Sequence, residues 1–106
     1  MIERYYNNEN QLAVLFSPGY GFGWSTEFEA PEIAWDKRIT EFWINENPPA
    51  YALRNVLIRL GYSDAEELPD EVFESLEVAW IPKGSPFYIE SDEGAERVIT
   101  GEIMIA

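Results

Sequence analysis

The sequence predicts one α+β domain over residues 1–106, in which a mainly antiparallel sheet of about four strands carries two helices on one face, in the order β-α-α-β-β-β. A short apolar run comes first, two segments with helical periodicity follow, and alternating apolar residues dominate the last third of the chain. Because 46% of the 106 residues are hydrophobic and 15% are aromatic, the chain has enough apolar surface to close a core.

The first half of the chain supplies one strand and both helices. Residues 11–17 are an apolar run ended by Ser-Pro-Gly, which is typical of a buried strand. Pro31 suits the first turn of a helix, and one face of that helix would carry Trp35, Ile39, Phe42 and Trp43. Lys37 and Glu41 are spaced to pair on it. A second helix is expected from about residue 50 to residue 60, with Gly61 as its C-terminal cap.

The second half is expected to be mostly strand. Residues 62–75 are interpreted as a short helix or loop, because Ser63 and Glu66 have capping-box spacing while Pro69 interrupts a long helix. Alternation over residues 76–80 and 87–90, around a Pro-Lys-Gly-Ser turn, predicts a hairpin. Residues 92–96 predict a second turn, and residues 97–105 a last strand that bends at Gly101.

The absence of two residue types restricts the chemistry. Without cysteine the chain has no disulfide and no thiol nucleophile, and without histidine it has no Ser-His-Asp triad and no imidazole-ligated metal. Carboxylate, Lys or Tyr chemistry, a cation held by oxygens, or no catalysis remain. We expect a protein that is not an enzyme and that uses no cofactor, because nothing places two of the 20 acids as a catalytic pair.

The charge balance restricts the partners. Twenty acidic residues against seven basic ones give a formal net charge of −13, which repels nucleic acid and anionic membranes. The sequence shows neither a signal-like N-terminus nor an apolar stretch near the roughly 20 residues of a membrane helix. We therefore expect a cytoplasmic protein that binds neither nucleic acid nor membranes directly.

A segment of alternating glycines and aromatic residues is the main candidate ligand site. Its members are Gly19, Tyr20, Gly21, Phe22, Gly23, Trp24, Ser25 and Thr26. Glycines let successive backbone N–H groups approach an anion, and the aromatic rings could stack on a base, so a nucleotide-like ligand would suit the segment. Lys37 and Arg38 are the candidate partners of its phosphate. In the alternative interpretation the glycines permit tight packing, the rings fill the core, and the two bases lie on a solvated helix face.

Two acidic clusters are the other candidates. Residues 64–77 contain seven acids without a base, namely Asp64, Glu66, Glu67, Asp70, Glu71, Glu74 and Glu77. Such a run could imitate DNA phosphates and occupy a nucleic-acid-binding protein, or it could serve only solubility. A second cluster, Glu90, Asp92, Glu93 and Glu96 around Gly94, is only loosely similar to a calcium loop, because the full set of alternating ligands is missing.

Residues 19–26, Gly-Tyr-Gly-Phe-Gly-Trp-Ser-Thr, followed by Ala34-Trp-Asp-Lys-Arg-Ile-Thr-Glu-Phe-Trp, resemble a group of small uncharacterised bacteriophage proteins. That group pairs a Gly-Tyr-Gly-x-Gly-Trp-Ser-Thr segment with an Asp-Lys-x-Ile helix, and the likeness extends over most of residues 11–99. The resemblance implies a phage accessory protein of the host cytoplasm. Such viral proteins often act in anti-defence, either by sequestering nucleotide signals or by blocking host nucleases as acidic DNA mimics.

Two functional hypotheses follow from these features. The first is a non-catalytic protein that sequesters a small nucleotide-like ligand through residues 19–26, with Lys37 and Arg38 on the phosphate; a homo-oligomer would gather its few bases into one pocket. The alternative is an acidic DNA-mimic inhibitor of a host nucleic-acid-binding enzyme or defence protein.

Overall fold

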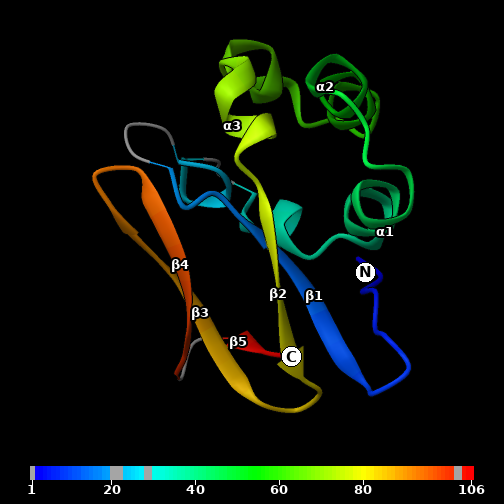
Figure 1. The fold of residues 1–106 in the computed structure, drawn as a ribbon, viewed down its shortest axis with the longest axis vertical. Helices are drawn as coiled ribbons and strands as arrows, with labels where there is room; N and C mark the ends of the chain where they lie inside the picture. The colour runs from blue at the N-terminus through cyan, green and yellow to red at the C-terminus, as the bar shows by residue number, and fades with distance from the viewer. Residues whose placement is uncertain (1, 20–22, 28–29, 102–103) are drawn as a thin grey trace.

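The computed structural model describes residues 2–19, 23–27, 30–101 and 104–106. The fold is α+β, with antiparallel strands in two small sheets and helices inserted between β1 and the other strands. In chain order the elements are β1 (Gln11–Phe16), η1 (Ser25–Glu27), η2 (Pro31–Ala34), α1 (Lys37–Glu46), α2 (Ala50–Arg59), η3 (Ser63–Glu67), α3 (Asp70–Glu74), β2 (Glu77–Pro82), β3 (Pro86–Asp92), β4 (Ala95–Thr100) and β5 (Met104–Ile105). Figure 1 shows α1, α2 and α3 gathered at one end of the molecule and the strands extending toward the other.

The β1–β2 ribbon lies between two apolar clusters. The strands pair antiparallel from Gln11 opposite Pro82 to Phe16 opposite Glu77. Because side chains alternate along a strand, Leu15 faces the helices, while Leu12 and Val14 face the second sheet. The ribbon therefore contributes to both halves of the core.

The second sheet has the strand order β4-β3-β5. A two-residue turn joins β3 to β4, and both of its residues, Glu93 and Gly94, have positive φ angles (53° and 87°), as a type I′ turn requires. Phe87 of β3 is fully buried against the ribbon, with its ring edge-on to Trp35 at 5.8 Å. This packing joins the sheets face to face.

The helices cover the other face of the ribbon. Buried Ile39 of α1, Leu53 and Leu57 of α2, and Val72 of α3 form one cluster with residues of the ribbon. The expected cap of α2 is confirmed: Gly61 has φ +98°, its N–H donates to Ile58, and the N–H of Tyr62 donates to Leu57. No helix within the described residues is both long enough and apolar enough to cross a membrane.

The helix expected from Pro31 is interrupted. Residues 31–34 form a separate 3₁₀ turn, and α1 begins only at Lys37, with Asp36 as its N-cap. The Asp36 carboxylate accepts the backbone N–H of Arg38, which stabilises a helix start at that point. Trp35 thereby joins the cluster between the sheets, whereas Ile39 joins the helical cluster. The two residues do not share one helix face, so that prediction is wrong.

Two strand predictions also need correction. Strands β2 and β3 are consecutive but do not pair, because β2 pairs with β1 while β3 pairs with β4 and β5. The turn between them is held elsewhere: the N–H of Lys83 donates to Asn10, and that of Gly84 donates to Ala106. The strand expected over residues 97–105 is two strands, β4 and β5, on opposite edges of β3. The segment 62–75, expected as helix or loop, contains the two short helices η3 and α3.

Candidate functional site

The glycine-aromatic segment leads from the end of β1 into η1. Tyr20, Gly21 and Phe22 lie outside the described residues. Gly19 lies beside Ser75, and a Cβ built on it would come no closer than 3.6 Å to that side chain. Since this is an ordinary contact and Gly19 has no positive φ, neither space nor backbone conformation demands glycine there.

Backbone N–H groups of this segment do surround an anion, and the anion is the side chain of Glu96. Oε1 of Glu96 accepts the N–H of Ser17 at 3.0 Å, and Oε2 accepts the N–H groups of Trp24 and Thr26 at 2.8 and 2.9 Å. The hydroxyl of Thr26 donates to the same Oε2 at 2.6 Å. Because the backbone N–H of Glu96 also donates to the carbonyl of Ser17, the start of β4 is bound to the end of β1 from both directions.

Glu96 is 2% exposed and has no ion-pair partner in the described parts of the chain. Burial of a carboxylate is costly unless hydrogen bonds replace its water shell. Four donors supply that replacement, from Ser17, Trp24 and Thr26 in the loop that follows β1, and three of them are backbone N–H groups of the kind that form anion-binding nests. The predicted anion-binding property of the segment is therefore used inside the molecule.

Trp24 is a core residue. Its side chain is fully buried and lies edge-on to Phe73, with ring centroids 5.8 Å apart and planes at 77°. Ser25 is 2% exposed, and Gly23 is buried as well. An exposed stacking surface at Trp24, as the ligand hypothesis required, is therefore wrong for this conformation; the alternative interpretation, a ring that fills the core, agrees with the structure.

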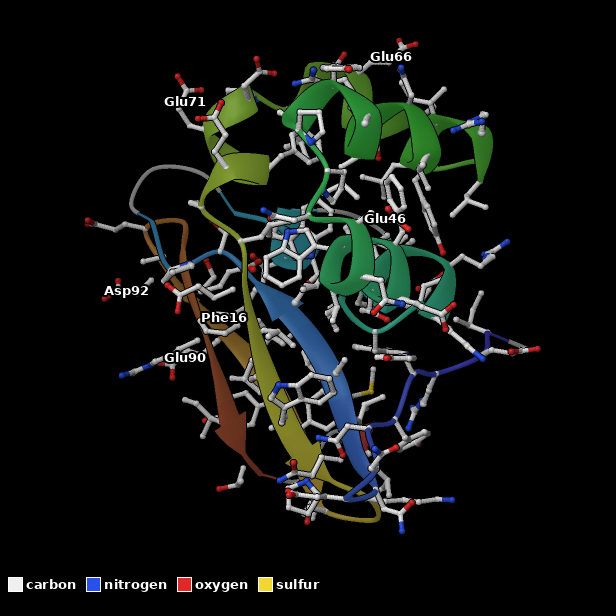
Figure 2. The ribbon with its side chains drawn as sticks, turned by 45° about the vertical axis from the view of Figure 1, so that its right-hand side comes forward. Phe16, Glu46, Glu66, Glu71, Glu90 and Asp92 are labelled. Atoms are coloured by element: carbon white, nitrogen blue, oxygen red, sulfur yellow. The ribbon has the colours of Figure 1, made fainter. Side chains whose placement is uncertain are left out.

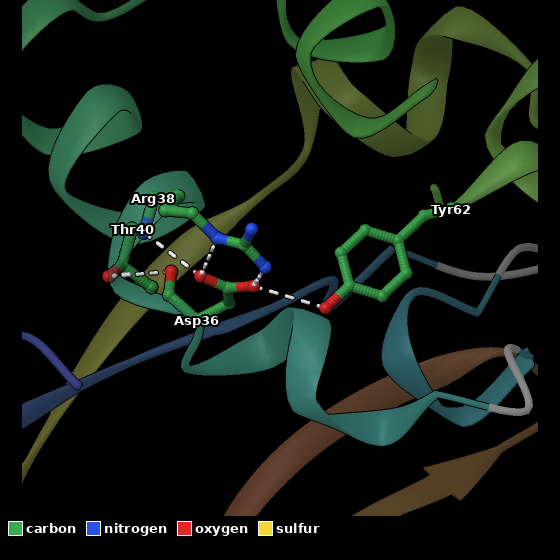
Figure 3. Close-up of polar contacts among 4 residues, drawn as sticks. All are labelled: Asp36, Arg38, Thr40 and Tyr62. Atoms are coloured by element: carbon green, nitrogen blue, oxygen red, sulfur yellow. Dashed lines mark hydrogen bonds and ion pairs between the residues drawn. The ribbon is translucent and has the colours of Figure 1, made fainter. Parts of the chain in front are cut away.

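Arg38 belongs to a cluster of polar groups at the start of α1 (Figure 3). The Asp36 carboxylate is 1% exposed and accepts Nε and Nη2 of Arg38 at 3.1 and 2.7 Å, together with the hydroxyl of Tyr62 at 3.0 Å. The hydroxyl of Thr40 donates to the backbone carbonyl of Asp36 at 3.2 Å. One edge of the Arg38 guanidinium is thus bound to Asp36, while 52% of the Arg38 side chain remains exposed.

Burial and hydrogen bonds in this cluster shift the pKa values of Asp36 and Tyr62. Burial is the largest single effect on the pKa of Asp36 and raises it, but the hydrogen bonds from Arg38 and Tyr62 together outweigh burial and hold that pKa below its ordinary value. Burial, followed by the hydrogen bond to the Asp36 carboxylate, raises the pKa of Tyr62 to about 12. Asp36 is therefore a carboxylate, and Tyr62 a neutral donor, across the physiological range.

An open groove of about 610 Å³ runs along α1 beside the N-terminal segment. Its lining includes both predicted cations, Lys37 and Arg38, with the apolar side chains of Ile2 and Phe42. It also includes the carboxylates of Glu3, Glu41 and Glu46. Lys37 contacts Glu3 at 3.8 Å and Glu41 at 3.9 Å, and the latter is the predicted i,i+4 pair. None of the described residues of the glycine-aromatic segment lines this groove, so the structure does not bring the two parts of the predicted site together.

All seven acids of residues 64–77 are exposed, while Ala65, Val72, Phe73 and Leu76 between them are buried. We call these seven carboxylates the acidic face. Figure 2 shows its labelled members Glu66 and Glu71 on the outside of the helical end of the molecule. In the described residues one cation contacts the face: Arg54 binds Asp70 at 2.6 Å.

Arg54 of α2 also binds the backbone of the segment that carries the acidic face. Its Nη2 donates to the carbonyl of Leu68 at 2.8 Å and its Nε to that of Ala65 at 3.3 Å, while its guanidinium lies 4.9 Å from the ring centre of Phe73. The side chain is 21% exposed. The base that pairs with the acidic face is thus also bound to backbone carbonyls, and the other six carboxylates have no ion-pair partner among the described residues.

The second acidic cluster is dispersed. Glu90 pairs with Arg97 at 3.1 Å, Asp92 and Glu93 are exposed, and Glu96 is directed into the loop. In the part of the chain that the structure describes, no three acids are grouped so that they could hold a metal ion.

Glu96 was missed as a structural centre because it was grouped with its acidic neighbours. The signal was its place in a strand: on β4, Glu96 shares a face with Val98, which packs in the core, whereas Arg97 between them is exposed. An acid at an inward strand position needs buried donors, and the glycine-rich segment was the candidate for providing them.

Comparison with protein-family models, curated proteins and solved structures finds no match for this chain.

Proposed function

We propose that this protein acts without catalysis by docking its acidic face on the basic, nucleic-acid-binding surface of a partner protein. The observation that carries the proposal is the arrangement of η3, α3 and the start of β2: the two short helices present six exposed carboxylates over a buried apolar side, and Glu77 of β2 adds the seventh. Repulsion among them is relieved at one point by Arg54, so a cationic surface would gain from neutralising the rest. A surface evolved for DNA phosphates is the cationic surface that such a face fits best.

The overall charge supports the same proposal. A net charge of −13 steers cationic partners toward the molecule from a distance and keeps nucleic acid away from it. Within the resemblance to phage accessory proteins, the partner would be a host nuclease or another DNA-binding defence protein.

The test compares two variants with equal charge changes. The first replaces Glu66, Glu67, Glu71 and Glu74 by Gln; the control replaces Glu9, Glu46 and Glu93 by Gln and Asp92 by Asn, which are also exposed and lie outside the acidic face. Proteins captured from bacterial lysate by the wild type should be released by salt and by duplex DNA. The first variant should retain about tenfold less of them, and the control nearly as much as the wild type. Capture that ignores salt and DNA, or equal loss in both variants, would contradict the proposal.

A second candidate function is the binding of a small nucleotide-like ligand in the groove along α1. The observation that favours it is the presence of Lys37 and the half-exposed Arg38 in one groove of about 610 Å³. The three carboxylates in the same lining oppose an anion, which is why this function ranks second. Calorimetry with linear and cyclic nucleotides tests it: binding should occur and should weaken in Lys37→Gln, and absence of binding across the panel would remove this candidate.

A further inference from the structure

Four donors of the loop converge on one carboxylate. They are the N–H groups of Ser17, Trp24 and Thr26 and the hydroxyl of Thr26, all 2.6 to 3.0 Å from an oxygen of Glu96. One donor serves Oε1 and three serve Oε2, so both oxygens are held and the orientation of the carboxylate is fixed. No cation takes part among the described residues, and the negative charge is held by backbone dipoles and one hydroxyl.

Parts of the fold other than Glu96 also help to position these donors. Ser17 follows β1, and its hydroxyl forms a hydrogen bond of 2.9 Å with that of Ser75. Trp24 is anchored by its buried ring against Phe73, and Thr26 lies in η1. Because these anchors do not pass through the Glu96 side chain, the donors stay assembled when that side chain is shortened. These N–H groups would then have lost their acceptor, and those of Ser17 and Trp24 lie in buried residues, which favours entry of another anion.

We propose that Ser17, Trp24 and Thr26 form a carboxylate-binding site that Glu96 fills from within the chain, and that the site takes a small external carboxylate when the Glu96 side chain is removed. In the native protein the tethered carboxylate occupies the site permanently and excludes external anions, including nucleotide phosphates. The site belongs to the loop and is independent of the acidic face.

The number of atoms removed from Glu96 sets the size of the external carboxylate that fits the site. Glu96→Ala removes Cγ, Cδ and both oxygens, which are the four non-hydrogen atoms of acetate. Glu96→Gly also removes Cβ, which leaves room for propionate. A packed interior accepts the guest that refills the lost volume and rejects a larger one. Acetate should therefore suit the Ala variant, and propionate the Gly variant.

The experiment measures the midpoint of thermal unfolding in sodium acetate, propionate and chloride at equal ionic strength. We expect Glu96→Ala to unfold at a lower temperature than the wild type and to regain several degrees in acetate, in a saturable manner, with less gain in propionate. Glu96→Gly should gain more from propionate than Glu96→Ala does. The wild type should show no difference between these salts. An equal response of the wild type and Glu96→Ala, or no acetate response in a folded Glu96→Ala, would overturn the proposal.

A second variant covers the case in which Glu96→Ala folds in none of these salts. Glu96→Gln keeps the volume but places an amide where the carboxylate accepted four hydrogen bonds. The single amide oxygen can replace Oε1 or Oε2 but not both, so hydrogen exchange should be at least tenfold faster than in the wild type either at the N–H of Ser17 or at those of Trp24 and Thr26, while exchange in α2 changes less. Unchanged exchange at all three N–H groups would show that the carboxylate is not their acceptor and would also overturn the proposal.

Discussion

The carboxylate of Glu96 lies 2.8 Å from the backbone nitrogen of Trp24, although 72 residues separate them in the chain. The contact connects the start of β4 to the loop that follows β1, and it is buried on both sides. It gives the glycine-aromatic segment a role inside the fold, because the donors that would receive a ligand already bind this carboxylate.

Trp24 is expected to contribute to stability as a core residue. Trp24→Ala should lower the free energy of unfolding by about 3 to 5 kcal/mol, because it removes a fully buried ring that packs against Phe73. Trp80→Ala, at a partly exposed ring tilted against Tyr5 at 6.4 Å, is the control and should cost less. Urea denaturation of both variants checks this, and an equal cost would count against a buried role for Trp24.

Asp36 is expected to stabilise the fold in a pH-dependent way. The pKa of Asp36 is lower in the folded protein than its ordinary value of 3.8, so its contribution is present above that pH and is lost as the pH falls through the folded pKa. Asp36→Asn should therefore be less stable than the wild type at neutral pH, and the difference should shrink below about pH 4. Denaturation at a series of pH values measures it; a difference that is constant with pH would contradict the assignment.

The phenol of Tyr62 is expected to ionise at a higher pH than an ordinary tyrosine. The pKa of Tyr62 is raised from 10.0 to about 12, so stability should fall as the pH rises from the first value through the second. Ultraviolet titration of tyrosinate should show one step near pH 12 that disappears in Tyr62→Phe. Tyr88→Phe provides a control without the hydrogen bond to Asp36. If the step survives in Tyr62→Phe, the contact with Asp36 is not the cause.

Two glycines should differ in their tolerance of alanine. A Cβ at Gly101 would lie 2.5 Å from ring atoms of Tyr88, so Gly101→Ala should cost about 1 to 3 kcal/mol through displacement of that ring. Gly19→Ala should be nearly neutral, because the nearest atoms lie 3.6 Å from the new Cβ. The double variant Gly101→Ala with Tyr88→Ala should lose less than the sum of the single changes. Unfolding measurements on the four proteins decide between these outcomes.

Local patterns predicted the elements well where each pattern had one interpretation. The apolar run predicted β1, the periodic residues and Gly61 predicted α2 and its cap, and the turn expected at residues 92–96 lies between β3 and β4, where it centres on Glu93 and Gly94. Pairing across the chain was harder to predict. Strands β2 and β3 look like a hairpin in sequence, but β2 pairs with β1, more than 60 residues earlier, and local alternation carries no information on that choice.

In the candidate site, too, features set by neighbouring residues were predictable and contacts between distant segments were not. The sequence predicted that the segment around Trp24 could surround an anion, and it does so within the described residues. It did not predict that the anion would come from β4, because one of 20 acids had to be selected by its position in the folded sheet. Lys37 and Arg38 were placed with the loop because they are close in sequence, but the break at Asp36 directs them to the groove along α1.

The most direct test of the central claim is the stability of Glu96→Gln compared with Glu77→Gln. Both changes remove one carboxylate and keep its volume, but Glu96 is buried among four donors and Glu77 is exposed on β2. Glu96→Gln should lower the free energy of unfolding by about 3 kcal/mol, and Glu77→Gln should change it by less than about 0.5 kcal/mol. Equal stability of the two variants would contradict the conclusion that the Glu96 carboxylate holds the loop.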